Sequence, residues 1–103
     1  MTSHKQFKIL YSETFYKDLY AIAYYIQEIL RNRAASRRLT TLIFNSINAR
    51  ADNAESFEPL LDDSGNKYFR IYVKNYVIYY RVENNTMEIA RIIFKNRDIS
   101  ELL

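Results

Sequence analysis

Residues 67–103 read KYFRIYVKNYVIYYRVENNTMEIARIIFKNRDISELL, and this stretch decides the fold. Apolar and polar residues alternate along three runs, which is the pattern of strands with one buried face. The runs are separated by Lys74-Asn75 and Asn84-Asn85, as two-residue hairpin turns require. The alternation reverses after Ile89, which predicts a β-bulge near Ala90-Arg91. The stretch therefore predicts a three-stranded antiparallel meander, followed by a short helical turn over about 98–103.

The first turn also predicts the register of its hairpin. With Lys74-Asn75 as the loop, Val73 faces Tyr76 and Phe69 faces Tyr80. One face of the sheet is then predicted to be core: Phe69, Ile71, Val73, Ile78, Tyr80 and Val82. The other face is expected to be wet and rich in Arg and Tyr: Arg70, Tyr72, Val77, Tyr79 and Arg81.

A strand over 7–11 and two helices precede this meander. Ser12 is a good N-cap for the first helix. Apolar residues spaced by three or four predict about five helical turns: Phe15, Leu19, Ile22, Ile26 and Ile29. Asn32 can cap a second helix over about 33–53, and 54–66 is the remaining loop. The short break between the helices predicts an antiparallel hairpin that covers one sheet face. We expect one α+β domain, 1–103, in the order β-α-α-β-β-β.

Composition excludes several kinds of site. The chain has no Cys and a single His, His4, near its N-terminus, so disulfides, thiol nucleophiles and His-based triads or metal sites are not expected. The acidic pair Asp62-Asp63 has no other acids at metal-ligand spacing, and no Gly-rich phosphate loop is present. We expect no cofactor and no metal. No stretch reaches the roughly 18 apolar residues of a membrane span, and a cytoplasmic location is expected.

Charge is distributed unevenly around a net +3. Residues 31–51 hold five arginines and no acidic residue, hence +5: Arg31, Arg33, Arg37, Arg38 and Arg50. Residues 52–63 hold five acidic residues and no basic one. Basic faces suit RNA, DNA or acidic peptides, although a solvated helix surface gives the same pattern.

Arg, Lys and Tyr remain as the chemically active side chains. Arg70 and Tyr72 are predicted to project from the exposed face of the meander, and Lys95 and Arg97 follow its last strand. Such a set can stabilise a phosphorane-like transition state by charge, without a metal. It can equally bind a protein or nucleic acid, because Arg and Tyr stack on bases and Arg grips phosphate.

Two segments carry a resemblance to a known family. These are ILYSETFYKDLYAIAYYI at 9–26, and the meander with its pattern R-x5-Y-x-I-x-Y-x-V followed by K-x-R-D. In this order they resemble the RelE/ParE toxins of bacterial type II toxin–antitoxin modules, which are involved in plasmid stabilisation. The resemblance covers nearly the whole chain.

The family implies two mechanisms. RelE-like members cut mRNA in the ribosomal A site with a metal-free set of Lys, Arg and Tyr, whereas ParE-like members lack that set and poison DNA gyrase. Arg70 and Arg97 match two positions of the nuclease set, but Tyr72, Val77 and Leu103 stand where a basic residue, an Arg and a Tyr would be. The long helical hairpin is also more ParE-like. A ParE-like gyrase inhibitor, not itself a nuclease, is therefore favoured.

Three alternatives stay open: mRNA cleavage by Arg70, Lys95 and Arg97, an inactive remnant, or a non-toxic interaction or RNA-binding module. The resemblance implies a cognate antitoxin as partner, and either a homodimer or a toxin–antitoxin hetero-oligomer as the assembly. Candidate antitoxin contacts are Tyr16, Tyr20, Tyr24, Arg70 and Tyr72. Candidate target contacts are Arg70, Tyr72, Tyr79, Lys95 and Arg97. Ion pairs of Arg81 and Arg91 with Glu83 and Glu88, and simple packing of the tyrosines, are the structural alternatives.

Overall fold

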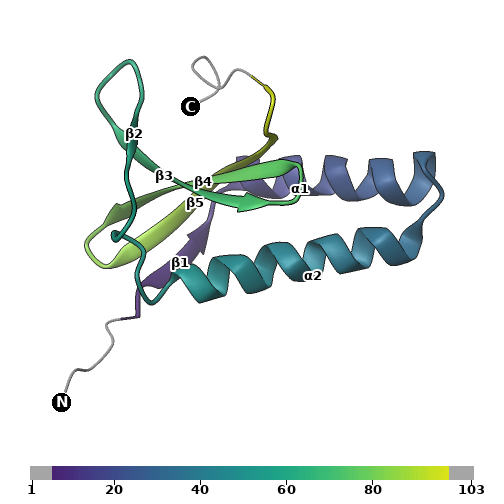
Figure 1. The fold of residues 1–103 in the computed structure, drawn as a ribbon, viewed down its shortest axis with the longest axis horizontal. Coiled ribbons are helices and arrows are strands. Elements are labelled where there is room, and N and C mark those ends of the chain that lie inside the picture. Colours follow the sequence, from purple (N-terminus) through teal and green to yellow (C-terminus); the bar gives the residue numbers. More distant parts are fainter. Residues whose placement is uncertain (1–5, 98–103) are drawn as a thin grey trace.

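The computed structural model describes residues 6–97, and its elements follow the predicted order (Figure 1). The elements are β1 (Lys8–Tyr11), α1 (Glu13–Tyr24), a π-helical turn η1 (Tyr25–Ile29), α2 (Arg33–Arg50), β2 (Leu60–Leu61), β3 (Lys67–Val73), β4 (Tyr76–Glu83) and β5 (Thr86–Phe94). The α+β class is confirmed, and Figure 1 shows α1 and α2 running antiparallel beside each other. The short strand β2 lies in the predicted loop and was missed. The predicted helical turn over 98–103 lies outside the described residues.

The strands form one sheet in the order β1-β5-β4-β3-β2. Strands β3, β4 and β5 are the predicted antiparallel meander, with Val73 opposite Tyr76 and Phe69 opposite Tyr80 as expected. The predicted bulge is confirmed: Tyr79 faces Arg91 while Tyr80 faces Ile89, so Ala90 is the extra residue. Strand β1 pairs in parallel with β5, a contact between the two ends of the fold that was not predicted.

The two hairpin turns differ in how well their residues suit them. Asn84 and Asn85 have φ of 50° and 66°, as a type I′ turn demands, and Asn tolerates this region. In the first turn Lys74 has φ of 54°. Lys has no side-chain compensation for the left-handed region, so the β3–β4 turn carries local strain that the β4–β5 turn avoids.

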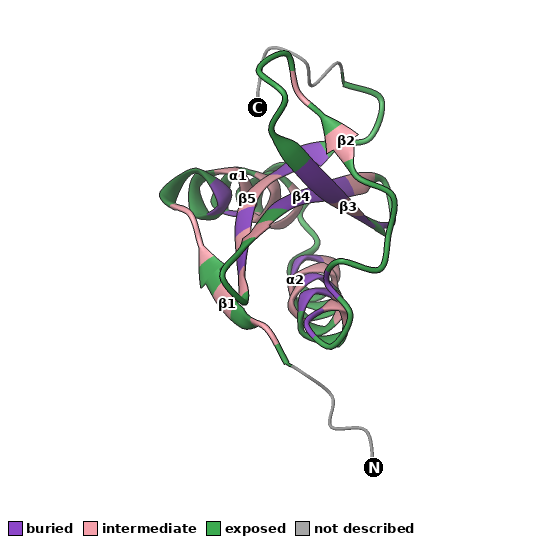
Figure 2. Ribbon diagram, turned by 90° about the vertical axis from the view of Figure 1, so that its left-hand side faces the viewer, coloured by how far each residue is buried: buried purple, intermediate pink, exposed green. Residues whose placement is uncertain are grey.

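The main core lies between the sheet and the helical hairpin, on what we call the inner face. Its fully buried members come from both helices, the segment that follows α2, and strands β4 and β5: Phe15, Ile43, Ile47, Ala51, Ala54, Ile78, Tyr80, Met87 and Ile89. The predicted inner positions of β3 and β4 join them, with Val82 only partly buried. Figure 2 shows β3 and β4 largely buried, whereas β1 and the helices have long exposed stretches.

The opposite side of the sheet, the outer face, is less wet than predicted. Four of its side chains are buried and form a second small cluster: Tyr68, Val77, Tyr79 and Ile93. Leu60 of β2 and the bulge residue Ala90 pack against this cluster. Residues 54–66, predicted as a loop, instead contribute strand β2, whose Leu60 helps to cover the tyrosine rings.

The first helix ends differently from the prediction. The N–H of Leu30 donates to the Tyr25 carbonyl at 3.0 Å, a bond that spans five residues instead of four. The wider turn shifts the side chains that follow, and Ile29, predicted on the apolar stripe, is 59% exposed. The N-caps were predicted correctly: Ser12 accepts from the N–H of Phe15 at 2.9 Å and Asn32 from Ala35 at 3.0 Å. Helix α2 ends at Arg50, three residues before the predicted end.

Candidate functional site

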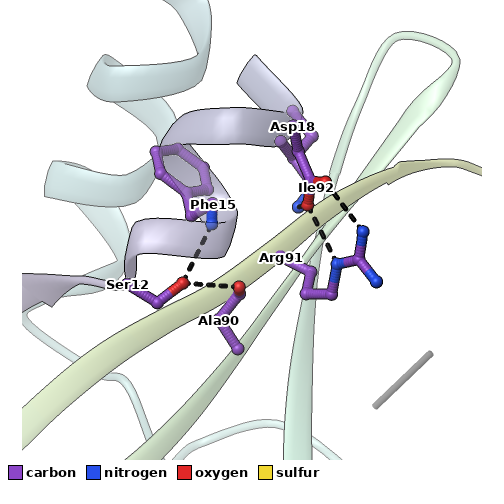
Figure 3. A network of polar contacts seen from close by, with 6 residues as sticks. All are labelled: Ser12, Phe15, Asp18, Ala90, Arg91 and Ile92. Carbon is purple, nitrogen blue, oxygen red and sulfur yellow. Dashed lines mark hydrogen bonds and ion pairs between the residues drawn. The ribbon is translucent and has the colours of Figure 1, made fainter. Parts of the chain in front are cut away.

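Helix α1 is fastened to β5 at the bulge (Figure 3). Strand β1 pairs with β5 only as far as Ile89, and α1 then follows the edge that β1 leaves open. The hydroxyl of Ser12 donates to the Ala90 carbonyl at 2.7 Å while it caps α1. The backbone N–H of Ser12 donates to the Ile89 carbonyl at 2.9 Å. One serine therefore begins the helix and satisfies the bulged backbone.

Asp18, one turn further along α1, completes this seam. Its carboxylate accepts two bonds from the Arg91 guanidinium, at 3.0 and 2.7 Å, and the backbone N–H of Ile92 at 3.2 Å. The pair is mostly buried, and the hydrogen bond to Asp18 raises the pKa of Arg91. The suggested pairing of Arg91 with Glu83 or Glu88 is therefore wrong. Arg81 does pair with Glu88, at 2.7 Å, as one alternative proposed.

Two rows of side chains cross the outer face. Arg70, Tyr79 and Arg91 face one another across β3, β4 and β5. The next row of the same face joins Tyr72, Val77 and Ile93. The structure therefore brings Arg70, Tyr72 and Tyr79 together, as the strand alternation predicted.

The exposure of these residues separates possible contact groups from packing groups. The ring of Tyr72 is 65% exposed, whereas Tyr79 is only 6% exposed. Burial, and then the nearby Tyr72, raise the pKa of Tyr79. Arg70 is half-buried. Tyr72 and Arg70 are therefore available to a partner, while Tyr79 mainly supports them.

Lys95 and Arg97 are exposed beyond the end of β5. The N–H of Lys95 donates to the Asn75 carbonyl at 2.8 Å, which places Lys95 beside the β3–β4 turn. Arg97 lines a cavity of about 390 Å³ between α1, η1 and the end of β5. Tyr25 and Tyr76 also line it, and burial raises the pKa of Tyr76. The sequence did not suggest this cavity, because its walls come from three distant segments.

The predicted tyrosines of α1 lie in the open. Tyr16, Tyr20 and Tyr24 are each at least half exposed, and the rings of Tyr20 and Tyr24 stack with centroids 6.3 Å apart. Tyr16 and Tyr20 border an apolar groove of about 720 Å³ that Leu19 and Ala23 also line and that reaches Thr40 of α2. This groove lies on the helical layer, so the sheet separates it from Arg70 and Tyr72.

Arg50 is the arginine of the 31–51 run that the fold uses internally. Its Nη1 donates to the Arg70 carbonyl and to the Tyr80 hydroxyl, both at 3.0 Å. The Tyr80 hydroxyl in turn donates to the Ala54 carbonyl at 2.7 Å. The guanidinium also lies 3.6 Å from the centre of the Phe57 ring. Arg50 thereby holds the 51–59 segment, and the backbone of Arg70, from the inner side.

Residues 6–97 lack a metal cluster and a membrane-spanning helix. This part of the chain contains no group of three or more His, Asp or Glu side chains placed to hold a metal ion. Asp62, from the acidic pair, instead accepts bonds from the backbone of Ser64 and Asn66 and orders its own loop. None of the described helices is long and apolar enough to cross a membrane.

Comparison with known proteins gives one family and several similar folds. The chain is similar to a chain in the structure of the chromosomal ParDE toxin–antitoxin system from P. aeruginosa, with a TM-score of 0.71, 14% identity, and coverage of 87% of this chain and 97% of that one. It is also similar to a chain of the Mycobacterium tuberculosis toxin–antitoxin complex RelBE2, with a TM-score of 0.60, 15% identity, and coverage of 86% and 98%. No curated protein matches the sequence. The model of the ParE toxin of the type II toxin–antitoxin system parDE matches residues 9–99, and the chain therefore belongs to this toxin family.

Proposed function

We propose that this ParE-family toxin arrests growth by inhibiting DNA gyrase and does not itself cleave mRNA. The main support is Val77, which is 2% exposed between Tyr72 and Ile93 at the centre of the outer face. Val77 stands where the nuclease set of RelE-like members has an arginine. An aliphatic side chain cannot donate a hydrogen bond to a phosphate. Tyr72 similarly replaces a basic residue on β3.

The proposed target contacts are the exposed groups that remain around this position. Arg70 and Tyr72 leave β3 on the outer face, and Lys95 and Arg97 follow β5. Tyr79 contributes by packing beneath them. These groups offer positive charge and one large exposed ring, which suits binding to a protein or protein–DNA surface.

We further propose a cognate antitoxin that wraps around the toxin. The apolar groove on α1, which Tyr16 and Tyr20 border, lies on the opposite side of the sheet from Arg70 and Tyr72. A partner that contacts both surfaces must therefore pass around the molecule. An extended segment that folds on binding can do this, with a helix in the groove and a strand against the sheet. Toxin–antitoxin complexes among the similar structures support such a partner.

Induction of the chain in a bacterial host tests the target. Growth arrest with altered plasmid supercoiling and intact mRNA is the expected result. Arrest with mRNA cut at ribosome-occupied codons would instead identify a nuclease that works without an arginine at position 77. The variant Arg70→Glu/Arg97→Glu should weaken toxicity or antitoxin binding, with its melting temperature measured as the folding control. If neither property changes, the assignment of these residues is wrong.

A further inference from the structure

The arginine-rich outer side of α2 is not used by any surface described so far. Its exposed residues include Arg33, Arg37, Arg38, Thr41 and Asn45, which we call the α2 basic face. Four of them, Arg37, Arg38, Thr41 and Asn45, line a shallow hollow of about 380 Å³ together with Leu42. The face is turned away from the buried residues Ile43 and Ile47 of the same helix. It is thus a continuous, solvent-facing strip along the helical hairpin.

The charge of this face is uncompensated within the described chain. Helix α2 contains no acidic residue along its whole length. The ion pairs found among residues 6–97 belong to Lys17, Arg81 and Arg91, so Arg33, Arg37 and Arg38 make none there. Arg33, the first residue of α2, also opposes the helix dipole. The three arginines therefore make no ion pair with the described part of the chain, which leaves their charges available to a partner.

We propose that the α2 basic face binds the phosphate backbone of duplex DNA. Arg, Thr and Asn are the side chains that commonly contact phosphate oxygens. From Arg33 to Asn45 the face extends about 18 Å, at about 1.5 Å per residue, along a polymer that carries one negative charge per about 1.7 Å. Three arginines can thus each reach a different phosphate.

The composition of the face favours duplex DNA over other acidic partners. A protein partner needs apolar or aromatic anchors, and the only large apolar side chain in the hollow is Leu42, 38% exposed. Single strands are held by aromatic stacking, and the hollow has no aromatic lining. An α-helix fits the major groove of DNA but not the narrow one of duplex RNA. The inference also deepens the proposed function, since gyrase acts on duplex DNA.

Binding of the full-length chain, made by cell-free synthesis, to a fluorescent DNA duplex of about 20 base pairs tests this proposal. Three phosphate contacts predict that affinity falls roughly 40-fold between about 50 and 200 mM salt. The triple variant Arg33→Gln/Arg37→Gln/Arg38→Gln should lose most of the affinity and of this salt dependence. The charge-matched control Lys8→Gln/Lys67→Gln/Lys74→Gln should keep both. Equal losses in the two variants, or no loss in the first, would overturn the proposal.

Two further arms separate the alternatives. Tighter binding of an equal-length RNA duplex or single strand than of duplex DNA would overturn the assignment of the ligand. Supercoiling by purified gyrase, measured with the same proteins, tests the proposed function separately. A wild type that binds DNA through α2 but leaves gyrase active would refute the gyrase proposal alone. A triple variant that still inhibits gyrase while DNA binding is lost would refute only the link between the two.

Discussion

The two faces of the sheet differ in how much apolar surface they bury and in which side chains they leave exposed. The inner face packs against α1 and α2 in one large apolar core, and the hydroxyl of its buried Tyr80 is satisfied by Arg50 and Ala54. Within residues 6–97 the outer face buries a cluster of four side chains and leaves Tyr72 exposed beside Arg70. The inner face therefore supplies most of the stability, while the outer face presents groups that the fold does not need. Substitutions on the two faces should separate folding from toxicity.

The neighbours Ile92 and Ile93 test this comparison with one kind of change. Both are buried on β5, 2% and 4% exposed, but they point to opposite faces. Ile92→Ala opens a cavity in the large core and should cost about 4 kcal/mol, whereas Ile93→Ala should cost about 2, because the small outer cluster can relax. Denaturant unfolding of both variants measures the difference. Equal costs would mean that the outer cluster matters as much to stability as the main core.

Asp18 holds the seam between the helical layer and the sheet. Asp18→Asn keeps the shape of the side chain but removes the negative charge opposite Arg91. It also places an amide NH₂ group, a hydrogen-bond donor, against the donors of Arg91 and Ile92. A cost of about 2 kcal/mol is expected, below that of a fully buried pair because both side chains remain partly solvated. Glu13→Gln, at the exposed pair with Lys17 on the same helix, is the control and should change little. Similar small effects would show that the seam does not depend on this charge.

Lys74 offers a change that stabilises the sheet without touching either face. Lys74→Gly removes the strain at φ of 54° and should add about 0.5–1 kcal/mol. Toxicity should be unchanged, because stability and activity reside on different groups. Asn84→Gly changes a turn position that Asn already suits, so it should raise the free energy of unfolding by less than Lys74→Gly does. A Lys74→Gly variant that is destabilised would contradict the assignment of strain to this turn.

Acidification should loosen the outer face before the inner one. Hydrogen bonds to Asp62, from the Asn66 side chain foremost, lower the pKa of this carboxyl below 3.8. A depressed folded pKa gives stability that is complete above the unfolded pKa and is lost as the pH falls through the folded one. The hydrogen-exchange protection factors of β2, whose Leu60 packs on the outer cluster, should therefore fall below pH 3.8 before that of the Ile92 amide. In Asp62→Asn this early step should be absent, and its persistence would refute the role of Asp62.

Much of this architecture was predictable because it rests on local rules. Strand alternation gave the register at Val73 and Tyr76, the change of alternation gave the bulge at Ala90, and short polar side chains marked both N-caps. The π-helical turn was not predictable, since Ile26 and Ile29 fit ordinary helical spacing equally well. Contacts across 70 or more residues, such as Ser12 with Ala90 and Asp18 with Arg91, carry no local pattern.

The candidate surfaces show the same limit. Alternation correctly grouped Arg70, Tyr72 and Tyr79, but burial of Tyr79 depends on how the outer face is covered. Spacing of four correctly placed Tyr16, Tyr20 and Tyr24 on one exposed stripe. The cavity beside Arg97 required the folded arrangement of α1, η1 and β5. Sequence therefore located single-element surfaces well and multi-element sites poorly.

The most direct test is supercoiling by purified gyrase in the presence of the full-length toxin. The wild type should inhibit, and Tyr72→Ala/Arg97→Glu should lose at least about tenfold in potency, as expected for contact residues, with its unfolding free energy within about 0.5 kcal/mol of wild type. Full gyrase activity at every toxin concentration would contradict the gyrase proposal. Undiminished potency of the double variant would contradict the division between a stabilising inner face and an acting outer face.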